Sequence, residues 1–181
     1  MATSPNLTTQ YTSEQFVESC GAILFDLSAQ NKTVCLIHHH AKNEWLLAKG
    51  RRNCGESRHE AALREVREET GYKAHLQPVT MYTRAPPIDE QGHMPDKPRS
   101  YPDLTEPFMV TIRQLGGDSE NDVKIIWWYI AALDEGEVAG SVGGEEKFTP
   151  EFFPLEEAVK KLSFRDDRTV LQNAIALVEG V

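Results

Sequence analysis

One stretch of the chain, from Gly50 to Tyr72, limits its fold and chemistry more than any other. Within it Glu65, Glu68 and Glu69 have the spacing i, i+3 and i+4, so a helix would place three carboxylates on one face. Like charges at this spacing destabilise a helix by roughly a few tenths of a kcal/mol per pair. Hard divalent cations such as Mg²⁺ take oxygen ligands and bridge carboxylates to phosphates. The spacing therefore predicts either a solvated acidic surface or a metal site.

The ends of this helix are also encoded locally. Ser57 followed by Glu60 is a capping box, which predicts a helix that begins near Arg58. Gly71 stands where a left-handed residue would end it. The preceding loop begins at Gly50, where a missing side chain permits close approach of the backbone. We therefore expect a loop–helix unit whose loop lies beside a row of carboxylates.

The order of residues in this stretch resembles the Nudix box. Gly50, five residues, Glu56, seven residues and then REVREETGY (64–72) match the pattern Gly, Glu, Arg-Glu-aliphatic-any-Glu-Glu-any-Gly-bulky at every fixed position. The chain is thus similar to the Nudix hydrolases. This resemblance implies an α/β fold, a Nudix-type α/β/α sandwich with a curved mixed sheet. It also implies hydrolysis of nucleoside diphosphate derivatives or related pyrophosphates with divalent cations.

The same resemblance implies roles for individual residues. Arg64 matches the arginine that orients a glutamate, and Glu56 matches a supporting carboxylate. Catalytic roles are expected for Arg64 and the three glutamates, and metal ligation is expected from Gly50, Glu65, Glu68 and Glu69. Mg²⁺ is the expected cofactor, with Mn²⁺ as an alternative.

The general base can lie elsewhere in such enzymes. In several Nudix groups it is a Glu on the loop before the penultimate helix, and the candidates here are Glu145 and Glu146. Glu146 matches better, because it lies nine residues before LEEA (155–158), as in the asymmetrical diadenosine tetraphosphate hydrolases. We therefore predict Glu146 as a catalytic residue.

The overall charge conflicts with a polyanionic substrate, but the local charge does not. The net charge is −9, which opposes long-range attraction of phosphates. Basic residues nevertheless gather between positions 38 and 58. From this group we predict substrate binding by Lys42, Lys49, Arg51 and Arg52. A pI near 5.2 argues against a nucleic-acid-binding face.

Two segments suggest a substrate class. The Lys49-Gly50 pair resembles the start of the box in diadenosine polyphosphate and diphosphoinositol polyphosphate hydrolases, with Ala48 in place of their proline. The C-terminal PLEEAVKKLSFRDDRTVLQNA is similar to the tail of the same enzymes. We expect a small phosphorylated substrate of one of these kinds. ADP-ribose, a nucleotide sugar or another nucleoside diphosphate derivative stays an alternative. A non-catalytic Nudix module that binds phosphorylated ligands or RNA is a further one, although such modules typically lose box glutamates.

The chain length favours one domain, 16–181, after a flexible leader, 1–15. Strands are expected at 19–27, 33–39, 44–48, 74–82, 108–112 and 124–133, and helices at 155–162 and 166–179 in addition to the box helix. The segment 84–107 holds six of the ten prolines and predicts a long loop, disordered in its middle. Its ends could contact substrate through Arg84, Lys97, Arg99 or Tyr101.

Location and membrane contact follow from composition. No apolar run approaches the roughly 20 residues of a membrane span. The N-terminus lacks the basic and apolar regions of a secretory signal, and the three widely spaced cysteines form no zinc or disulfide pattern. We expect a cytoplasmic protein without membrane contact, with the nucleus as a second compartment. Oligomeric state is not specified by any motif.

Overall fold

The first long strand is apolar on both faces, so helices must pack on both sides of the sheet that contains it. In the computed structural model, which describes residues 6–28, 32–88, 95–116, 122–137 and 145–181, strand β1 (Phe16–Asp26) lies in the middle of a large sheet. Its Ala22 and Leu24 pack with residues of one helix, whereas Ile23 and Phe25 pack with residues of another. A strand buried on both faces reads as a continuous apolar run, which explains the sequence AILF.

The other elements complete a mixed sheet between two helical layers. The remaining strands are β2 (Thr33–His39), β3 (Glu44–Leu46), β4 (Lys49–Arg51), β5 (Ala74–Leu76), β6 (Val79–Thr83), β7 (Arg99–Leu104), β8 (Met109–Gln114), β9 (Val123–Leu133) and β10 (Phe148–Pro154). The helices are α1 (Arg58–Thr70), α2 (Leu155–Lys161) and α3 (Arg165–Glu179). The main path of the large sheet is β10-β2-β1-β9-β5, and β1 and β9 run parallel.

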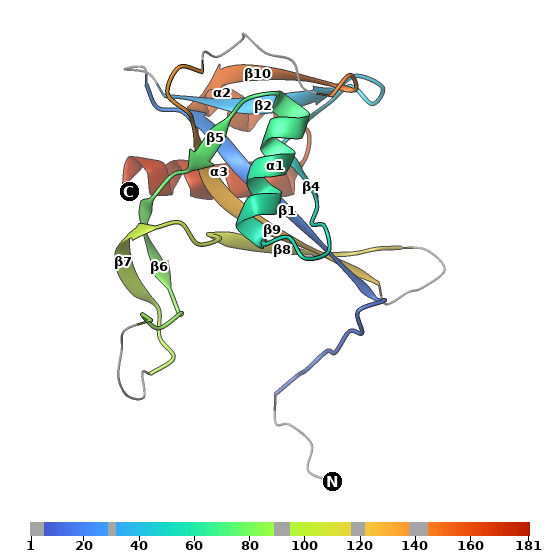
Figure 1. Ribbon diagram of the computed structural model, residues 1–181, viewed down its shortest axis with the longest axis vertical. Helices are drawn as coiled ribbons and strands as arrows, with labels where there is room; N and C mark the ends of the chain where they lie inside the picture. Colours follow the sequence, from blue (N-terminus) through green and yellow to red (C-terminus); the bar gives the residue numbers. More distant parts are fainter. Residues whose placement is uncertain (1–5, 29–31, 89–94, 117–121, 138–144) are drawn as a thin grey trace.

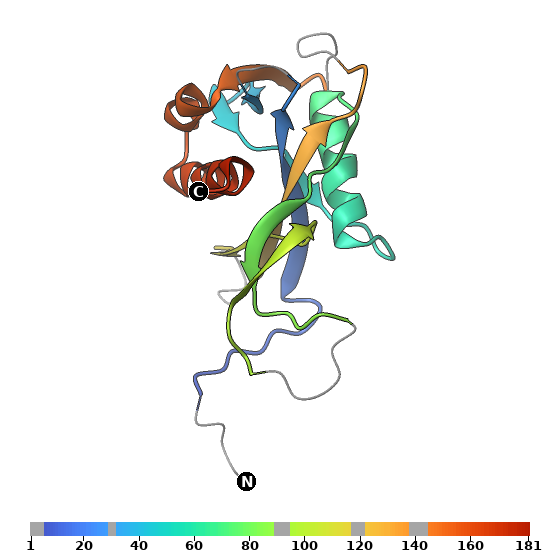
Figure 2. The same cartoon turned by 90° about the vertical axis from the view of Figure 1, so that its left-hand side faces the viewer.

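Helix α1 covers one face of this sheet, and α2 and α3 cover the other (Figures 1 and 2). Ala61, Ala62 and Val66 of α1 pack on one face of β1, and Val170 and Leu171 of α3 belong to the core on the opposite face. The prediction of an α/β sandwich with a mixed sheet is therefore confirmed.

The loop–helix unit forms as its local signals predict. The Ser57 N–H donates to the carboxylate of Glu60 at 2.9 Å, and the Glu60 N–H donates to the Ser57 hydroxyl at 3.3 Å, which completes the capping box. Gly71 ends α1 with φ of 79°. On the other side of the loop, β4 pairs with β1 and places Gly50 opposite Cys20. The start of the box is thus fixed to the central strand of the sheet.

Several strand predictions need correction. The single strand expected at 74–82 is two strands, β5 in the large sheet and β6 in a separate two-stranded sheet. Pro78 lies between them and has no N–H for a ladder, which explains the break. The strand expected at 44–48 ends at Leu46, and a further short strand, β4, follows it. Strand β10 was not predicted. It pairs with β2 along its whole length.

The loop predicted for 84–107 is wrong at its C-terminal end. Residues Arg99–Leu104 form β7, which pairs with β6 and extends away from the large sheet (Figure 1). Pro102 and the positive φ of Asp103, 56°, obscure this strand in the sequence. The middle of the segment, 89–94, lies outside the described residues, as do residues 1–5 of the leader. Among the described residues no helix is long and apolar enough to cross a membrane.

Candidate active site

Arg64 lies among the carboxylates of α1 and fixes their positions. Its Nε and Nη2 donate to the two oxygens of Glu56 at 2.8 and 3.1 Å. Its Nη1 donates to Glu65 at 2.7 Å and to Glu68 at 2.9 Å. A further hydrogen bond, 2.9 Å long, joins Nη2 to the backbone carbonyl of Arg51. One guanidinium thus offsets repulsion among three carboxylates and ties α1 to β4, which is what the predicted orienting role requires.

Glu69 joins α1 to the strand that carries the glycine. Its Oε2 accepts a hydrogen bond from the backbone N–H of Lys49 at 2.7 Å, and the residue is 8% exposed. Burial raises the pKa of Glu69 to about 7, although the hydrogen bond from Lys49 opposes this effect. In the absence of a cation, this carboxyl group is therefore close to its titration point at neutral pH.

Glu65 lies beside Gly50 and is equally buried. Burial raises the pKa of Glu65, the contacts with Arg64 lower it in part, and the neighbouring Glu68 carboxylate raises it further. A Cβ placed on Gly50 would overlap the Glu65 carboxylate, so only glycine at position 50 is compatible with the carboxylate in this position. Two buried carboxylates and a backbone segment thus meet at one point.

The chemistry of this point fits a hard divalent cation. Glu65, Glu68, Glu69 and the carbonyl of Gly50 offer oxygen ligands alone, which Mg²⁺ prefers. Within the described ranges no three acidic, histidine or cysteine side chains already converge as a closed metal cluster. Arg64 holds Glu65 and Glu68, and the Lys49 N–H holds Glu69. Because Mg²⁺ keeps several waters and takes few carboxylates, the residues fit it without a closed cluster.

The loop before β10 brings a further carboxylate to α1. The backbone N–H of Glu145 donates to the carbonyl of Glu68 at 3.0 Å, and the Glu145 charge contributes to the raised pKa values of Glu65 and Glu69. Lys147 pairs with Glu145 at 2.6 Å. Glu146 is exposed and forms no hydrogen bond or ion pair with the described residues. Of the two candidate bases, the structure therefore brings Glu145 next to the box carboxylates, and Glu146 stays a prediction.

Arg52 is bound within the protein, and its predicted substrate contact stays a prediction. Its Nε pairs with Glu18 at 2.9 Å, and its Nη1 donates to the carbonyls of Asn53 at 3.2 Å and Glu56 at 2.8 Å. Glu18 also pairs with Arg58 at 2.7 Å. Arg52 therefore fastens the box loop to β1, and its neighbours in sequence gave no sign of this because Glu18 lies on a different strand.

Four cations gather on the face of the sheet opposite α1. Since Gly50 faces α1, its neighbours Lys49 and Arg51 face the other way. Arg113 on β8 is directly opposite Lys124 on β9. Burial and the charges of the other three cations lower the pKa of Lys124, so the four lie near one another. None of them forms a side-chain ion pair with another described residue. Lys49 and Arg51 were predicted as substrate contacts, whereas Arg113 and Lys124 were missed.

A cavity of about 410 Å³ adjoins this cluster. Lys42, Lys49 and Arg113 line it, together with residues at the start of α3. Lys42 and Lys49 thus line one cavity, while Arg51 lies one residue beyond Gly50 on β4, and substrate binding by these residues stays a prediction. The cavity and the box carboxylates lie on the two sides of β4, so Lys49 belongs to both: its backbone contacts Glu69 and its side chain lines the cavity.

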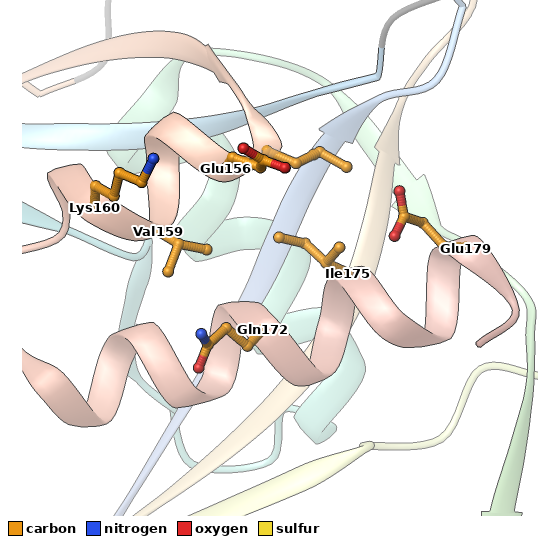
Figure 3. Close-up of a pocket in the computed structure, with 7 residues that line it drawn as sticks. Glu156, Val159, Lys160, Gln172, Ile175 and Glu179 are labelled. Atoms are coloured by element: carbon orange, nitrogen blue, oxygen red, sulfur yellow. The ribbon is translucent and has the colours of Figure 1, made fainter.

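A second cavity, about 370 Å³, lies between α2 and α3 (Figure 3). Val159 and Ile175 lie between the two helices, with the polar side chains of Glu156, Lys160 and Gln172 around them. Both helices lie on the face of the sheet opposite α1 (Figure 2). None of the residues that line this cavity belongs to β4 or α1, so it is not part of the candidate site.

Comparison with family models decides the family. The model described as the NUDIX domain matches residues 18–174. The chain belongs to the Nudix family. The prediction of a Nudix pyrophosphohydrolase is thereby confirmed at the level of the family, whose members act on phosphoanhydride bonds and generally use divalent metals.

Solved Nudix structures share the fold at low sequence identity. An Ap4A hydrolase from C. elegans is 16% identical, with a TM-score of 0.55 over 90% of this chain and 98% of that one. A Nudix hydrolase from Clostridium perfringens is 19% identical, with a TM-score of 0.54 and coverage of 92% and 99%. The E. coli dihydroneopterin triphosphate pyrophosphohydrolase is 11% identical, with a TM-score of 0.55 and coverage of 90% and 95%. Comparison with curated proteins gave no match. At these identities the likeness establishes the fold alone.

The metal-free Nudix protein is expected to lose stability as the pH rises from about 5 to about 7. The pKa of Glu69 is raised from 4.5 to about 7, so in this window the folded state holds a proton that the unfolded state has released. The free energy of unfolding therefore falls with rising pH until both states are ionised. Melting temperatures measured in a chelator between about pH 5.5 and pH 7.5 test this.

The matched control is Glu69→Gln, which removes the titrating group while the histidines remain. The pH dependence of the difference between wild type and variant isolates Glu69. Because Mg²⁺ binds the ionised carboxylate, it should raise the wild-type melting temperature more at about pH 7.5 than at about pH 5.5. Equal shifts at both pH values would contradict ligation by Glu69.

Proposed function

We propose that this Nudix protein uses Mg²⁺ to hydrolyse a phosphoanhydride bond in diadenosine polyphosphates or diphosphoinositol polyphosphates by attack of water at phosphorus. The observation that carries the proposal is the meeting of β4 and α1. There the buried Glu65 and Glu69 carboxylates lie beside Gly50, and unpaired cations lie on the other side of the same strand. The sequence resemblance to those hydrolases and the fold shared with an Ap4A hydrolase are in keeping with it.

Each part of the site has a task in such a reaction. Arg64 keeps Glu65 and Glu68 in place, and the Lys49 N–H keeps Glu69 in place. Divalent cations neutralise pyrophosphate oxygens and lower the pKa of water. A carboxylate that ligates a metal is a poor base, so a proton acceptor outside the ligand set is favoured. Glu145 is the described residue that lies best for it, and Glu146 is the alternative from sequence.

The cations account for a phosphate-rich substrate despite the net charge of −9. Lys49, Arg51, Arg113 and Lys124 concentrate positive charge on one face and form no side-chain ion pair in the described part of the chain, although the charge of Asp167 acts on Lys49 and Arg113. Clusters of like charge are costly unless an opposite charge binds there. A chain of phosphates that runs from this face to the box carboxylates and their metals would supply it.

The test is a substrate panel with Mg²⁺ or Mn²⁺. Diadenosine polyphosphates, a diphosphoinositol polyphosphate and ADP-ribose are each incubated with wild type and with Glu69→Gln, and released nucleotide or phosphate is measured. Cleavage of either of the first two classes, lost in the variant, is the expected result. A preference for ADP-ribose would overturn the proposed substrate class. No cleavage of any substrate would favour a binding module, against which the complete set of box glutamates argues.

A further inference from the structure

Glu18 lies on β1, outside the box, and its carboxylate binds donors from three other elements. Its Oε2 accepts a hydrogen bond from Arg52 Nε at 2.9 Å. Its Oε1 accepts hydrogen bonds from Arg58 Nε at 2.8 Å and from the indole N–H of Trp127 at 2.9 Å. The Glu18 side chain is 11% exposed. One carboxylate thus joins the box loop, the first residue of α1 and strand β9 to the central strand.

The contact with Arg52 continues through the box loop to Arg64. Arg52 Nη1 donates to the backbone carbonyls of Asn53 at 3.2 Å and Glu56 at 2.8 Å. The Asn53 N–H in turn donates to the Glu56 carboxylate at 2.9 Å. The same carboxylate accepts two hydrogen bonds from Arg64. A continuous series of hydrogen bonds therefore runs from Glu18 on β1 to the arginine that holds the box carboxylates.

The contact with Arg58 holds the other end of the loop. Arg58 is the first residue of α1, and its guanidinium pairs with Glu18 at 2.7 Å. The same guanidinium lies 4.2 Å from the centre of the Trp127 ring, where the electrons of the indole attract a cation. Both ends of the segment that joins β4 to α1 are therefore bound to the same carboxylate.

The fold itself does not depend on this carboxylate. The backbone N–H of Arg52 donates to the Glu18 carbonyl at 3.1 Å, and β4 pairs with β1 through backbone groups, so the two strands should stay paired without the side chain. Arg52 and Arg58 are 29% and 47% exposed, so water can solvate both cations when the carboxylate is removed. Such ion pairs contribute little net stability, because desolvation offsets their attraction. The role of Glu18 is therefore to be sought in the position of the loop.

The charge of Glu18 keeps Arg52 away from the Glu56 carboxylate. Burial raises the pKa of Glu18, but hydrogen bonds from Arg58 and Trp127 outweigh burial, so the pKa lies below its ordinary value and the group is ionised at neutral pH. The positive charge of Arg52 already acts on Glu56 and helps to lower the pKa of that carboxyl. Without an anion at position 18, Arg52 would compete with the arginine of α1 for Glu56.

We infer that Glu18 is a positioning residue for the candidate metal site. It binds Arg52 and thereby leaves the Glu56 carboxylate to Arg64, which holds two of the expected metal ligands. This inference rests on the proposed function and adds to it a residue outside the box. Glu18 acts through other residues and touches neither the substrate nor the metal.

Amide hydrogen exchange of the metal-free protein, measured by NMR, tests this geometry without metal or substrate. Glu18→Gln keeps the shape of the side chain and removes its charge. The Asn53 N–H, which binds Glu56, should then exchange about tenfold faster or more, because the loop opens more often. The Lys49 N–H, which binds Glu69, is the internal control and should exchange as in wild type. Equal exchange of Asn53 in the two proteins would overturn the inference.

Binding of Mg²⁺ alone, measured by titration calorimetry, tests the effect on the expected ligands. Glu18→Gln should weaken Mg²⁺ binding about tenfold or more, as loss of a group that orients metal ligands commonly does. Glu18→Asp keeps the charge and should recover part of the affinity. Glu151→Gln makes the same chemical change at an exposed position of β10 and should bind Mg²⁺ as wild type does. A lowered melting temperature of Glu18→Gln with unchanged Mg²⁺ affinity would show a purely structural role and overturn the inference.

A double variant tests the route through Glu56. If Glu18 acts through Glu56, then Glu18→Gln combined with Glu56→Gln should bind Mg²⁺ about as Glu56→Gln alone does. Independent, additive losses would overturn this route. Arg52→Lys keeps the charge but not the several hydrogen bonds of the guanidinium, so it should weaken Mg²⁺ binding as Glu18→Gln does. It answers the same question if Glu18→Gln does not fold.

The positioning role and the proposed function fail in different ways. With a cleaved substrate, Glu18→Gln should lower kcat about tenfold or more and change KM less than about twofold. Faster exchange of Asn53 and weaker Mg²⁺ binding, without cleavage of any substrate, would support the positioning role and overturn the hydrolysis. Hydrolysis that Glu69→Gln abolishes, with kcat and Mg²⁺ affinity unchanged in Glu18→Gln, would support the hydrolysis and overturn the positioning role.

Discussion

Glu69→Gln is expected to lower kcat by about a hundredfold or more while the protein stays folded. The carboxylate lies where β4 meets α1, and its Oε2 accepts the Lys49 N–H at 2.7 Å. Glutamine has the same shape, and its amide oxygen can accept the same hydrogen bond. The substitution therefore removes a negative charge and the proposed metal ligand without opening a cavity. Steady-state rates with a cleaved substrate, at saturating Mg²⁺, measure the loss.

The stability of the same variant separates catalysis from folding. Glu69 is buried and has a raised pKa, so ionisation of its carboxyl group at neutral pH destabilises the metal-free protein. We expect Glu69→Gln to melt at the same or a higher temperature than metal-free wild type. Glu157→Gln makes the same chemical change at an exposed position of α2 and should keep full activity. Glu69→Gln with more than about a tenth of wild-type activity would overturn the role of Glu69, since loss of such a group commonly has a far larger effect.

The box helix could be predicted because its signals are local. Ser57 and Glu60 set its start, Gly71 sets its end, and the spacing of the glutamates sets their common face. The sandwich could be predicted from the family resemblance. Strand β7 could not, because Pro102 and Asp103 are residues that strands usually avoid, and its pairing with β6 depends on distant sequence.

The rest of the candidate site depends on contacts between distant elements. Arg113 and Lys124 reach the cation cluster only through the pairing of β8 with β9, and Asp167 reaches the cavity only when α3 packs on the sheet. The ion pair of Arg52 depends on a distant element in the same way. Its place next to Arg51 suggested a shared role, whereas the structure pairs Arg52 with Glu18 on β1. Sequence proximity predicts the box itself but not which charges remain free around it.

Gly50→Ala is expected to lower activity by about a hundredfold or more with little loss of stability. The new Cβ would overlap the carboxylate of Glu65, which is the flexible end of a side chain and can rotate away. This movement would break the 2.7 Å contact between Glu65 and Arg64 and remove Glu65 from the proposed set of metal ligands. The fold would therefore tolerate the added methyl group, whereas the catalytic activity would be lost. Activity and melting temperature of the same preparation measure the two effects.

Alanine substitutions at two other glycines are the controls for Gly50→Ala. Gly21→Ala, on β1 opposite Lys49 of β4, would place its Cβ 2.5 Å from the Ala48 carbonyl, 2.7 Å from Lys49 Cβ and 2.8 Å from the Trp128 ring. These atoms are backbone or packed core, so this variant should lose about 1–3 kcal/mol of stability. The Cβ of Gly116→Ala would meet no atom of the described residues within 4 Å, and this variant should be neutral in both measurements. The opposite ranking, in which Gly50→Ala unfolds the protein or keeps its activity, would show that β4 and Glu65 do not form the metal-binding point of this enzyme.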